Sequence, residues 1–177
     1  MQPVILGDLF HFPRDNPNWL ITRLIELFAE YPTVGIYGNH DCFVNELTED
    51  DTLMVLQAGG HLPLLSDEVW LQIGIEGQEV VLAGTPWGKR FPPPDLNPAE
   101  KFGCPDARVV WVTHHDLKVS GYESFGRIPI QGIPGVDCVV NGHLHHPVET
   151  VEKDGTRWCV PGNIARVKNS DATSKAV

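Results

Sequence analysis

The residues of this sequence that are best suited to chemistry lie directly after short apolar runs. The runs are residues 4–6, 33–37, 108–112 and 136–140, and each reads as a buried strand. The polar clusters that follow them are Asp8, Asn39 with His40, His114 with His115, and His143 with His145. In open α/β sheets, ligands bind in the crevice beyond the carboxyl ends of the strands. We therefore expect these separate clusters to converge on one site.

The side chains in the clusters are of types that hold divalent metal ions. Carboxylate oxygen, amide oxygen and imidazole nitrogen together suit manganese, zinc or iron. Asp8 supplies the one carboxylate of this set, and a carboxylate can bridge two cations. Two metals about 3.5–4 Å apart can activate a bridging water and stabilise an in-line displacement at phosphorus. The pattern therefore predicts a metal site and, as its reaction, the hydrolysis of a phosphoester.

Each cluster also has an ordinary explanation when it is taken alone. A glycine–aspartate turn is common, and the asparagine–histidine pair also fits a polar turn. His143 and His145 share one face of a strand, so they also fit an exposed strand edge. His114 and His115 cannot point the same way on a strand, so at most one of them is expected as a ligand. The combination of clusters is what favours metal binding.

Two helices are expected to support the strands that carry these clusters. Residues 18–30 place apolar side chains at helical spacing before Pro32 stops the helix. Residues 53–58 form a shorter helix, for which Thr48 and Asp51 resemble a capping pair. Both helices lie between predicted strands, which is typical of an α/β protein.

Hairpins and one proline-rich loop complete the expected elements. Residues 69–75 and 79–83 flank a glycine-containing turn and predict a hairpin, and a last hairpin turns at residues 153–155. Residues 86–98 hold five prolines and are expected to form an ordered surface loop near the site.

Four segments, in order along the chain, resemble four of the five motifs of the calcineurin-like metallophosphoesterase superfamily. They are Gly7-Asp8-Leu9-Phe10-His11, Gly38-Asn39-His40-Asp41, Thr113-His114-His115 and Gly142-His143-Leu144-His145. The resemblance extends from residue 1 to about residue 167 and rests on motif order, spacing and the preceding strands. It implies an α/β fold of two packed mixed β-sheets flanked by helices, with the site at one end.

The resemblance also implies a ligand set for two divalent metal ions. Asp8 would bridge the ions, and Asn39, His114 and His143 would complete one metal site. His145 would belong to the other. Manganese is the metal expected first, with zinc or iron as alternatives.

The resemblance gives the catalytic role to His40. Its imidazole would approach the scissile phosphate and stabilise the transition state or protonate the leaving group, with Asp41 as its orienting partner. Arg166 follows a Pro-Gly-Asn turn and stays unassigned. Supporting or structural roles are expected for three histidines that adjoin the motifs without matching the usual ligands: His11, His115 and His146.

The sequence departs from the superfamily pattern at its beginning. The first motif, Asp-x-His, normally ends a strand upstream of Gly7, where this chain has only six residues. Without that motif, the second metal would keep only Asp8 and His145 from the protein. We expect one metallophosphoesterase domain over residues 1–177, shortened at its N-terminus, where its first strand would be missing, and also at its C-terminus. The alternative, a genuinely short protein with impaired chemistry, stays open.

Composition narrows the classes of partner. With 177 residues, of which 42% are hydrophobic, the chain can bury one core. Its net charge of -10 disfavours non-specific coating of nucleic acid, although bound metal ions could reverse the local field for a phosphate. The four cysteines form no C-x-x-C pair, and no apolar run approaches the roughly 20 residues that span a bilayer. A reducing, cytoplasmic location is the default expectation.

Several substrates and one further class of function remain open. The region after Gly7 and the segment 161–166 are similar to double-strand-break repair exonucleases, which makes DNA one candidate. Cyclic nucleotides, nucleotide esters and phosphoproteins are others. The alternative class is a non-catalytic scaffold with this fold that binds a partner protein. A structural zinc protein would need a closed tetrad of cysteines or histidines, and the sequence has none.

Overall fold

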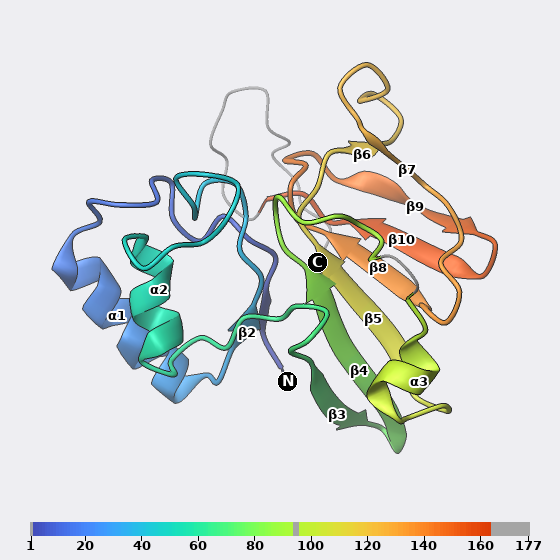
Figure 1. Cartoon of the computed structure of the whole chain (residues 1–177), viewed down its shortest axis with the longest axis horizontal. Helices are drawn as coiled ribbons and strands as arrows, with labels where there is room; N and C mark the ends of the chain where they lie inside the picture. Colours follow the sequence, from blue (N-terminus) through green and yellow to red (C-terminus); the bar gives the residue numbers. More distant parts are fainter. Residues whose placement is uncertain (1, 94–95, 164–177) are drawn as a thin grey trace.

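A six-stranded mixed sheet is the largest element of the fold (Figure 1). The computed structural model describes residues 2–93 and 96–163. The strands, in their order across the sheet, are β3 (Leu71–Ile75), β4 (Gln78–Thr85), β5 (Arg108–Thr113), β8 (Cys138–Asn141), β10 (Thr156–Val160) and β9 (Val148–Lys153). The four central strands are parallel, and β3 and β9 pair antiparallel at the edges. The carboxyl ends of the central strands therefore meet at one edge of the sheet.

A two-stranded parallel sheet packs against the large one. It consists of β1 (Val4–Ile5) and β2 (Val34–Gly35), with Val4 opposite Val34. Apolar side chains next to and within this pair form one buried cluster with β4 and β5, which includes Val34, Ile36, Val80, Leu82 and Val112. The predicted arrangement of two packed sheets with helices outside is confirmed, and the second sheet is the smaller one.

Helices cover the outer faces of both sheets (Figure 1). The helices α1 (Asn18–Glu30) and α2 (Thr52–Ala58) lie on the side of β1–β2 that faces away from the large sheet. The short helix α3 (Pro98–Phe102) lies on the opposite face of the large sheet, where the ring of Phe102 packs 6.2 Å from that of the fully buried Trp111. Within the part of the chain that the structure describes, no helix is long and apolar enough to cross a membrane.

Both predicted hairpins are confirmed. The turn between β3 and β4 contains Glu76 and Gly77, and the turn between β9 and β10 contains Asp154 and Gly155. All four residues have positive φ angles, between 47° and 82°, as tight two-residue turns require. These turns lie at the end of the sheet away from the carboxyl edge, so they leave that edge free for a site.

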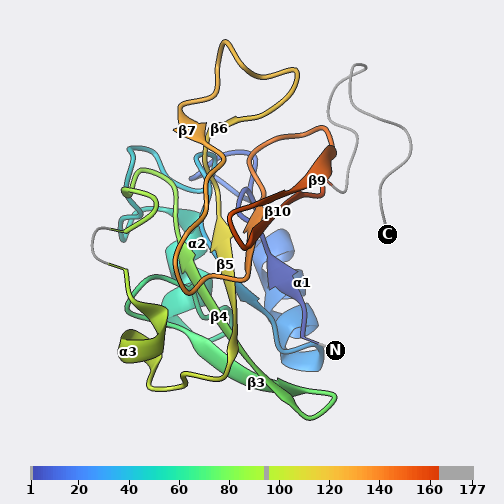
Figure 2. The same cartoon turned by 90° about the vertical axis from the view of Figure 1, so that its right-hand side faces the viewer.

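A third pair of strands projects beyond the carboxyl edge of the large sheet (Figures 1 and 2). It consists of β6 (Leu117–Lys118) and β7 (Ile128–Pro129), which are parallel. The chain leaves β5 at Thr113 and enters β6 three residues after His114. The segment that contains β6 and β7 therefore begins beside His114, a predicted site residue.

Candidate metal centre

The predicted convergence of polar clusters is found at the carboxyl edge. Asp8 follows β1, Asn39 follows β2, His114 follows β5 and His143 follows β8. Asp8, His114 and His143 each offer one ligand atom, and these atoms all lie within 4.8 Å of one another. The amide Oδ1 of Asn39 is 3.2 Å from Nε2 of His114. The structure thus brings together four residues that are far apart in the sequence.

The polar atoms around His114 are arranged so that a cation could bind between them. Its Nδ1–H donates to the carbonyl of Leu6 at 2.7 Å, which leaves Nε2 as a lone-pair acceptor in the neutral ring. This Nε2 faces Oδ2 of Asp8 at 3.2 Å and Oδ1 of Asn39 at the same distance. Three acceptors that face one another repel unless a proton or a metal ion lies between them. Because His114 is only 1% exposed, water cannot easily relieve that repulsion.

His143 offers a second imidazole to the same point. Its Nε2 lies 2.9 Å from Oδ1 of Asp116, whereas its buried Nδ1 has no hydrogen-bond partner among the described residues. If Nε2–H donates to the carboxylate, Nδ1 carries a free lone pair. Burial, followed by the charge of His114, lowers the pKa of His143 although Asp116 opposes the shift. A neutral imidazole with a free nitrogen is the form that binds metal.

Asp8 is held in a strained backbone conformation. Its φ angle is 54°, in the left-handed region, and Gly7 before it has a φ of 91°. Its Oδ1 accepts the backbone N–H of His40 at 2.9 Å. Burial tends to raise the pKa of Asp8, but hydrogen bonding and charge from His114, with help from His40, hold that pKa below its ordinary value. The carboxylate is therefore ionised at neutral pH and ready for a cation.

Asp41 makes its hydrogen bonds to the backbone of two loops. Its fully buried carboxylate accepts backbone N–H groups from Asp8 and Gly38 at 2.8 Å and from Phe10 at 3.0 Å. Burial raises its pKa to about 6 in spite of these bonds. The side chain points inward and joins the two loops that carry Asp8 and Asn39. Asp41 therefore holds these two loops together, and the structure shows no contact between its side chain and the ring of His40.

The ring of His40 is oriented by His11 instead. Nδ1 of His40 lies 3.0 Å from the carbonyl of His11, and the two rings stack with centroids 5.3 Å apart. The hydrogen bonds of Asp41 go to backbone N–H groups, so any effect of Asp41 on the His40 ring is indirect, through the loop that carries both residues. Because the bond to the His11 carbonyl uses Nδ1, the other ring nitrogen, Nε2, is not involved in it. The His40 side chain is partly exposed.

The remaining predicted histidines fall outside the group of three. Both ring nitrogens of His115 are engaged, one by the Thr113 hydroxyl and the other by the Lys89 carbonyl at 2.9 Å. His145 is not in the group that offers ligand atoms within 4.8 Å among the described residues. The backbone carbonyl of His145 accepts the N–H of Asn163 at 3.1 Å, and His146 is partly buried. Arg166 lies outside the described residues.

Asp116 and Trp87 contact the centre but were not predicted from the sequence. Asp116 contacts His143 directly, and the indole of Trp87 stacks on the same imidazole with centroids 5.1 Å apart and planes at 28°. The signal for Asp116 was its position immediately after the histidine pair. Trp87 lies in the proline-rich loop that was expected near the site, but nothing in that loop singled out the tryptophan.

Fold and site together define an α/β sandwich with a carboxylate–histidine group at the carboxyl edge of its parallel strands. The structure is similar to that of the Thermus thermophilus sulfate thiohydrolase SoxB in complex with glycerol, with a TM-score of 0.52 and 14% identity over 90% of this chain and 33% of that one. It is also similar to a 5′-nucleotidase precursor from the same organism, with a TM-score of 0.51 and 16% identity over 90% of this chain and 38% of that one.

These likenesses show the fold. The sandwich of two packed β-sheets with helices outside is confirmed, and the chain spans well under half the length of each similar structure. No protein-family model and no curated protein sequence matches the chain.

Proposed function

We propose that this chain is a metal-dependent phosphoesterase of the calcineurin-like type, which hydrolyses phosphate mono- or diesters. The observation that carries the proposal is that Nε2 of His114 lies 3.2 Å from both Oδ2 of Asp8 and Oδ1 of Asn39, with a ring nitrogen of His143 within 4.8 Å of ligand atoms of Asp8 and His114. The donor set of carboxylate, amide and imidazole suits manganese first, and zinc or iron next.

The residues of the centre would supply the ligands of two metal sites. Asp8, Asn39, His114 and His143 would hold one divalent ion, and Asp8 with His145 would contribute to a second. Bound there, the ions would polarise the phosphoryl group and lower the pKa of water at the site. The strained backbone of Asp8 and the buried bonds of Asp41 fix where the Asp8 carboxylate lies.

His40 is the residue we propose for transfer of a proton to the leaving group. The bond from its Nδ1–H to the His11 carbonyl orients the ring, and in the doubly protonated ring Nε2–H could donate its proton to the departing alcohol, which leaves the neutral imidazole with its proton on Nδ1. In this role Asp41 acts indirectly, since it holds the loop from which His40 projects.

Nucleotides are the first substrates to test. One of the similar structures is a 5′-nucleotidase precursor, which supports this choice. DNA phosphodiesters are the second class, which the resemblance to repair exonucleases favours and the net charge of -10 opposes.

The test combines metal analysis with one substitution. Protein purified without chelator is expected to contain manganese, zinc or iron, and to hydrolyse bis(p-nitrophenyl) phosphate. His40→Ala is expected to keep the metal and lose about 10²–10⁴-fold in kcat, which is the range that general acid catalysis contributes. His61→Ala, a histidine that follows α2, is the matched control. Metal-free protein, or an unchanged kcat in His40→Ala, would contradict the proposal.

A further inference from the structure

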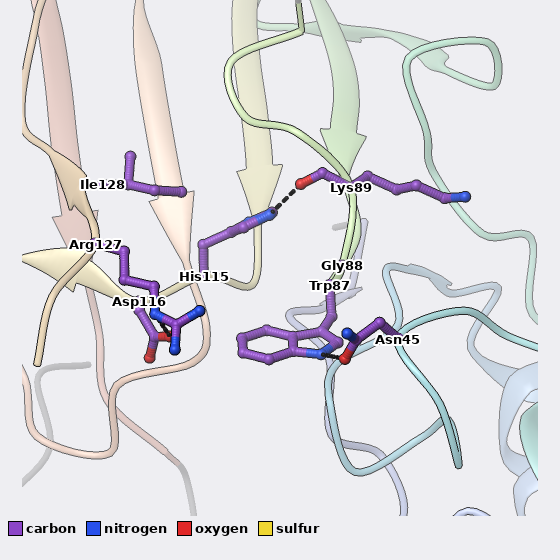
Figure 3. Close-up of a pocket in the computed structure, with 8 residues that line it drawn as sticks. All are labelled: Asn45, Trp87, Gly88, Lys89, His115, Asp116, Arg127 and Ile128. Carbon is purple, nitrogen blue, oxygen red and sulfur yellow. Dashed lines mark hydrogen bonds and ion pairs between the residues drawn. The ribbon is translucent and has the colours of Figure 1, made fainter.

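A cavity of about 250 Å³ lies directly beside the candidate metal centre (Figure 3). Two of its lining residues, Trp87 and Asp116, are the same residues that contact His143. Its volume of about 250 Å³ is a little below the roughly 300–1,000 Å³ of pockets that enclose a whole drug-sized ligand. The cavity is therefore too small for a second large ligand and well suited to one group of a substrate that is held at the centre.

Trp87 presents a fixed flat surface to this cavity. Its indole N–H donates to Oδ1 of Asn45 at 3.2 Å, and its backbone N–H donates to the carbonyl of Tyr37 at the same distance. The ring also stacks on His143. Because these contacts hold the partly buried indole before any ligand arrives, a planar group can stack on it with little loss of side-chain entropy.

Arg127 forms another wall of the cavity. Figure 3 draws its guanidinium beside Asp116, on a different side of the cavity from the indole of Trp87. Its Nε lies 3.8 Å from Oδ2 of Asp116, a loose ion pair, and its side chain is 86% exposed. Ile128, the next residue, adds an apolar surface. An indole face, a movable guanidinium plane and an aliphatic side chain suit a flat ring.

The charges of the lining favour the same kind of group. The ammonium of Lys89 lies 2.5 Å from the carboxylate of Glu46, so this lysine is already paired. Asp116 faces both His143 and Arg127. The cavity therefore has no strong unpaired charge of its own for a second phosphate, and its binding surface is mainly aromatic and aliphatic.

We propose that this cavity binds the planar aromatic group on the alcohol side of the phosphoester, stacked on Trp87, while the phosphate lies at the metal centre. A nucleobase and a simple aryl ring share this chemistry. The proposal rests on the proposed function, because it assigns the substrate class of the same site. Trp87 is then a residue that determines specificity.

The test measures binding to metal-free protein, so that it does not depend on hydrolysis. Adenosine, which has no phosphate, and phenol are titrated by calorimetry into chelator-treated wild type, Trp87→Ala and Trp87→Phe. Trp87→Ala is expected to weaken binding by a factor on the order of ten, and Trp87→Phe to keep most of it, since stacking needs only a flat ring. Trp19→Ala, an exposed tryptophan on α1, is the control.

Each outcome has a definite meaning. Binding of adenosine alone identifies the group as a nucleobase, and binding of both ligands identifies any planar ring. If neither ligand binds wild type, or if folded Trp87→Ala binds adenosine as well as wild type does, the proposal is overturned. The phenylalanine variant controls for misfolding, because it is expected to bind the ligands that the alanine variant binds only weakly.

Kinetics with metal-loaded protein provides a second readout. Trp87→Ala is expected to raise KM for adenosine 5′-monophosphate or phenyl phosphate about tenfold more than it raises KM for methyl phosphate, which has no ring. An equal rise for all three substrates would contradict a role for Trp87 in recognising the ring. Absence of hydrolysis with every substrate would count against the proposed function alone, because adenosine binding is measured without it.

Discussion

The carboxylate of Asp116 lies 2.9 Å from Nε2 of His143 and holds that imidazole in one tautomer. A metal-binding histidine depends on such a partner for its orientation and basicity. Asp116→Ala is therefore expected to weaken binding of Mn²⁺ about 10–100-fold, as measured by calorimetry on chelator-treated protein. Asp116→Asn should fall between, because its amide oxygen can still accept the hydrogen bond.

The control for this prediction is Asp106→Ala, which removes an exposed carboxylate in the turn before β5. It is expected to leave Mn²⁺ affinity unchanged, although it lowers the net negative charge by the same amount. Equal losses in the two variants would mean that Asp116 acts through its charge and not through His143.

At the scale of single residues, side-chain types could be predicted from the sequence but contacts could not. The polar clusters were predicted to converge because each follows an apolar run, and the resemblance singled out Asp8, Asn39, His114 and His143, which lie together. The backbone hydrogen bonds of Asp41 could not be predicted, because whether a carboxylate in a turn points inward or toward its neighbour depends on backbone geometry. The stacking of Trp87 on His143 joins residues that are far apart in the sequence, so no local sequence pattern could predict it.

At the scale of elements, β1 and β8 approach closely where the site is built. A Cβ placed on Gly142 would lie 2.0 Å from the Leu6 carbonyl oxygen, which is also the acceptor for Nδ1 of His114. Gly142→Ala is therefore expected to push the strand ends apart and to lower the free energy of unfolding by about 1–3 kcal/mol in urea titrations. It should weaken metal binding as well.

Gly74→Ala in β3 is the matched control for this substitution. A Cβ there would meet no atom within 4 Å, so the free energy of unfolding should stay close to that of wild type. If Gly142→Ala unfolds at the same urea concentration as Gly74→Ala, the close approach of β1 and β8 is not required for stability.

The loop before α2 is held by a buried carboxylate. Asp51 is 1% exposed, and its oxygens accept the backbone N–H and the hydroxyl of Thr48 at 2.9 Å and Nε of Arg14 at 3.2 Å. Burial tends to raise the pKa of Asp51, but Thr48 and Arg14 outweigh it and the pKa is lowered. The predicted pairing of Thr48 with Asp51 is found, yet the carboxylate bonds back to Thr48 and makes no side-chain cap to the helix.

The lowered pKa of Asp51 gives a stability prediction with a definite sign. Between its folded-state pKa and the ordinary value near 3.9, the unfolded chain binds more protons, so stability falls as pH falls through this window. Above about pH 5 the contribution is fully present. Asp51→Asn should therefore be less stable than wild type at pH 7, and the difference should shrink below about pH 4. Urea titrations across pH 3–7 measure it, with the exposed Asp50→Asn as control.

Most elements could be predicted because they are local. The helix at residues 18–30 and both hairpins follow from spacing and turn residues, and they are found at nearly the predicted bounds. The strands β1 and β2 lie within the predicted runs 4–6 and 33–37, whereas β6 and β7 are two residues long and no sequence pattern predicted them. Which sheet each strand joins is decided by packing between residues that are distant in sequence.

At the scale of the whole molecule, charge and metal binding are linked. The chain carries a net charge of -10, and Asp8 adds a partly buried carboxylate beside two imidazoles at the centre. A cation bound at the centre would be held jointly by Asp8, Asn39 and His114, in place of the proton that can lie between these groups in the metal-free protein. Metal binding should therefore stabilise the folded state and not merely add a catalyst.

The expected size of this stabilisation follows from mass action. At a free Mn²⁺ concentration 100 times Kd, the folded state gains about 2.7 kcal/mol. For a chain of 177 residues, each kcal/mol raises Tm by about 2–4 °C, so a rise of roughly 5–11 °C is expected in thermal unfolding. An acidic surface also binds cations weakly, and this alone would raise Tm in any variant. Asp8→Asn distinguishes the two causes, because it removes the central carboxylate and should abolish most of the rise. Glu149→Gln on β9 removes an exposed charge and should leave it intact, so a rise that survives in Asp8→Asn would locate the stabilising cation away from this centre.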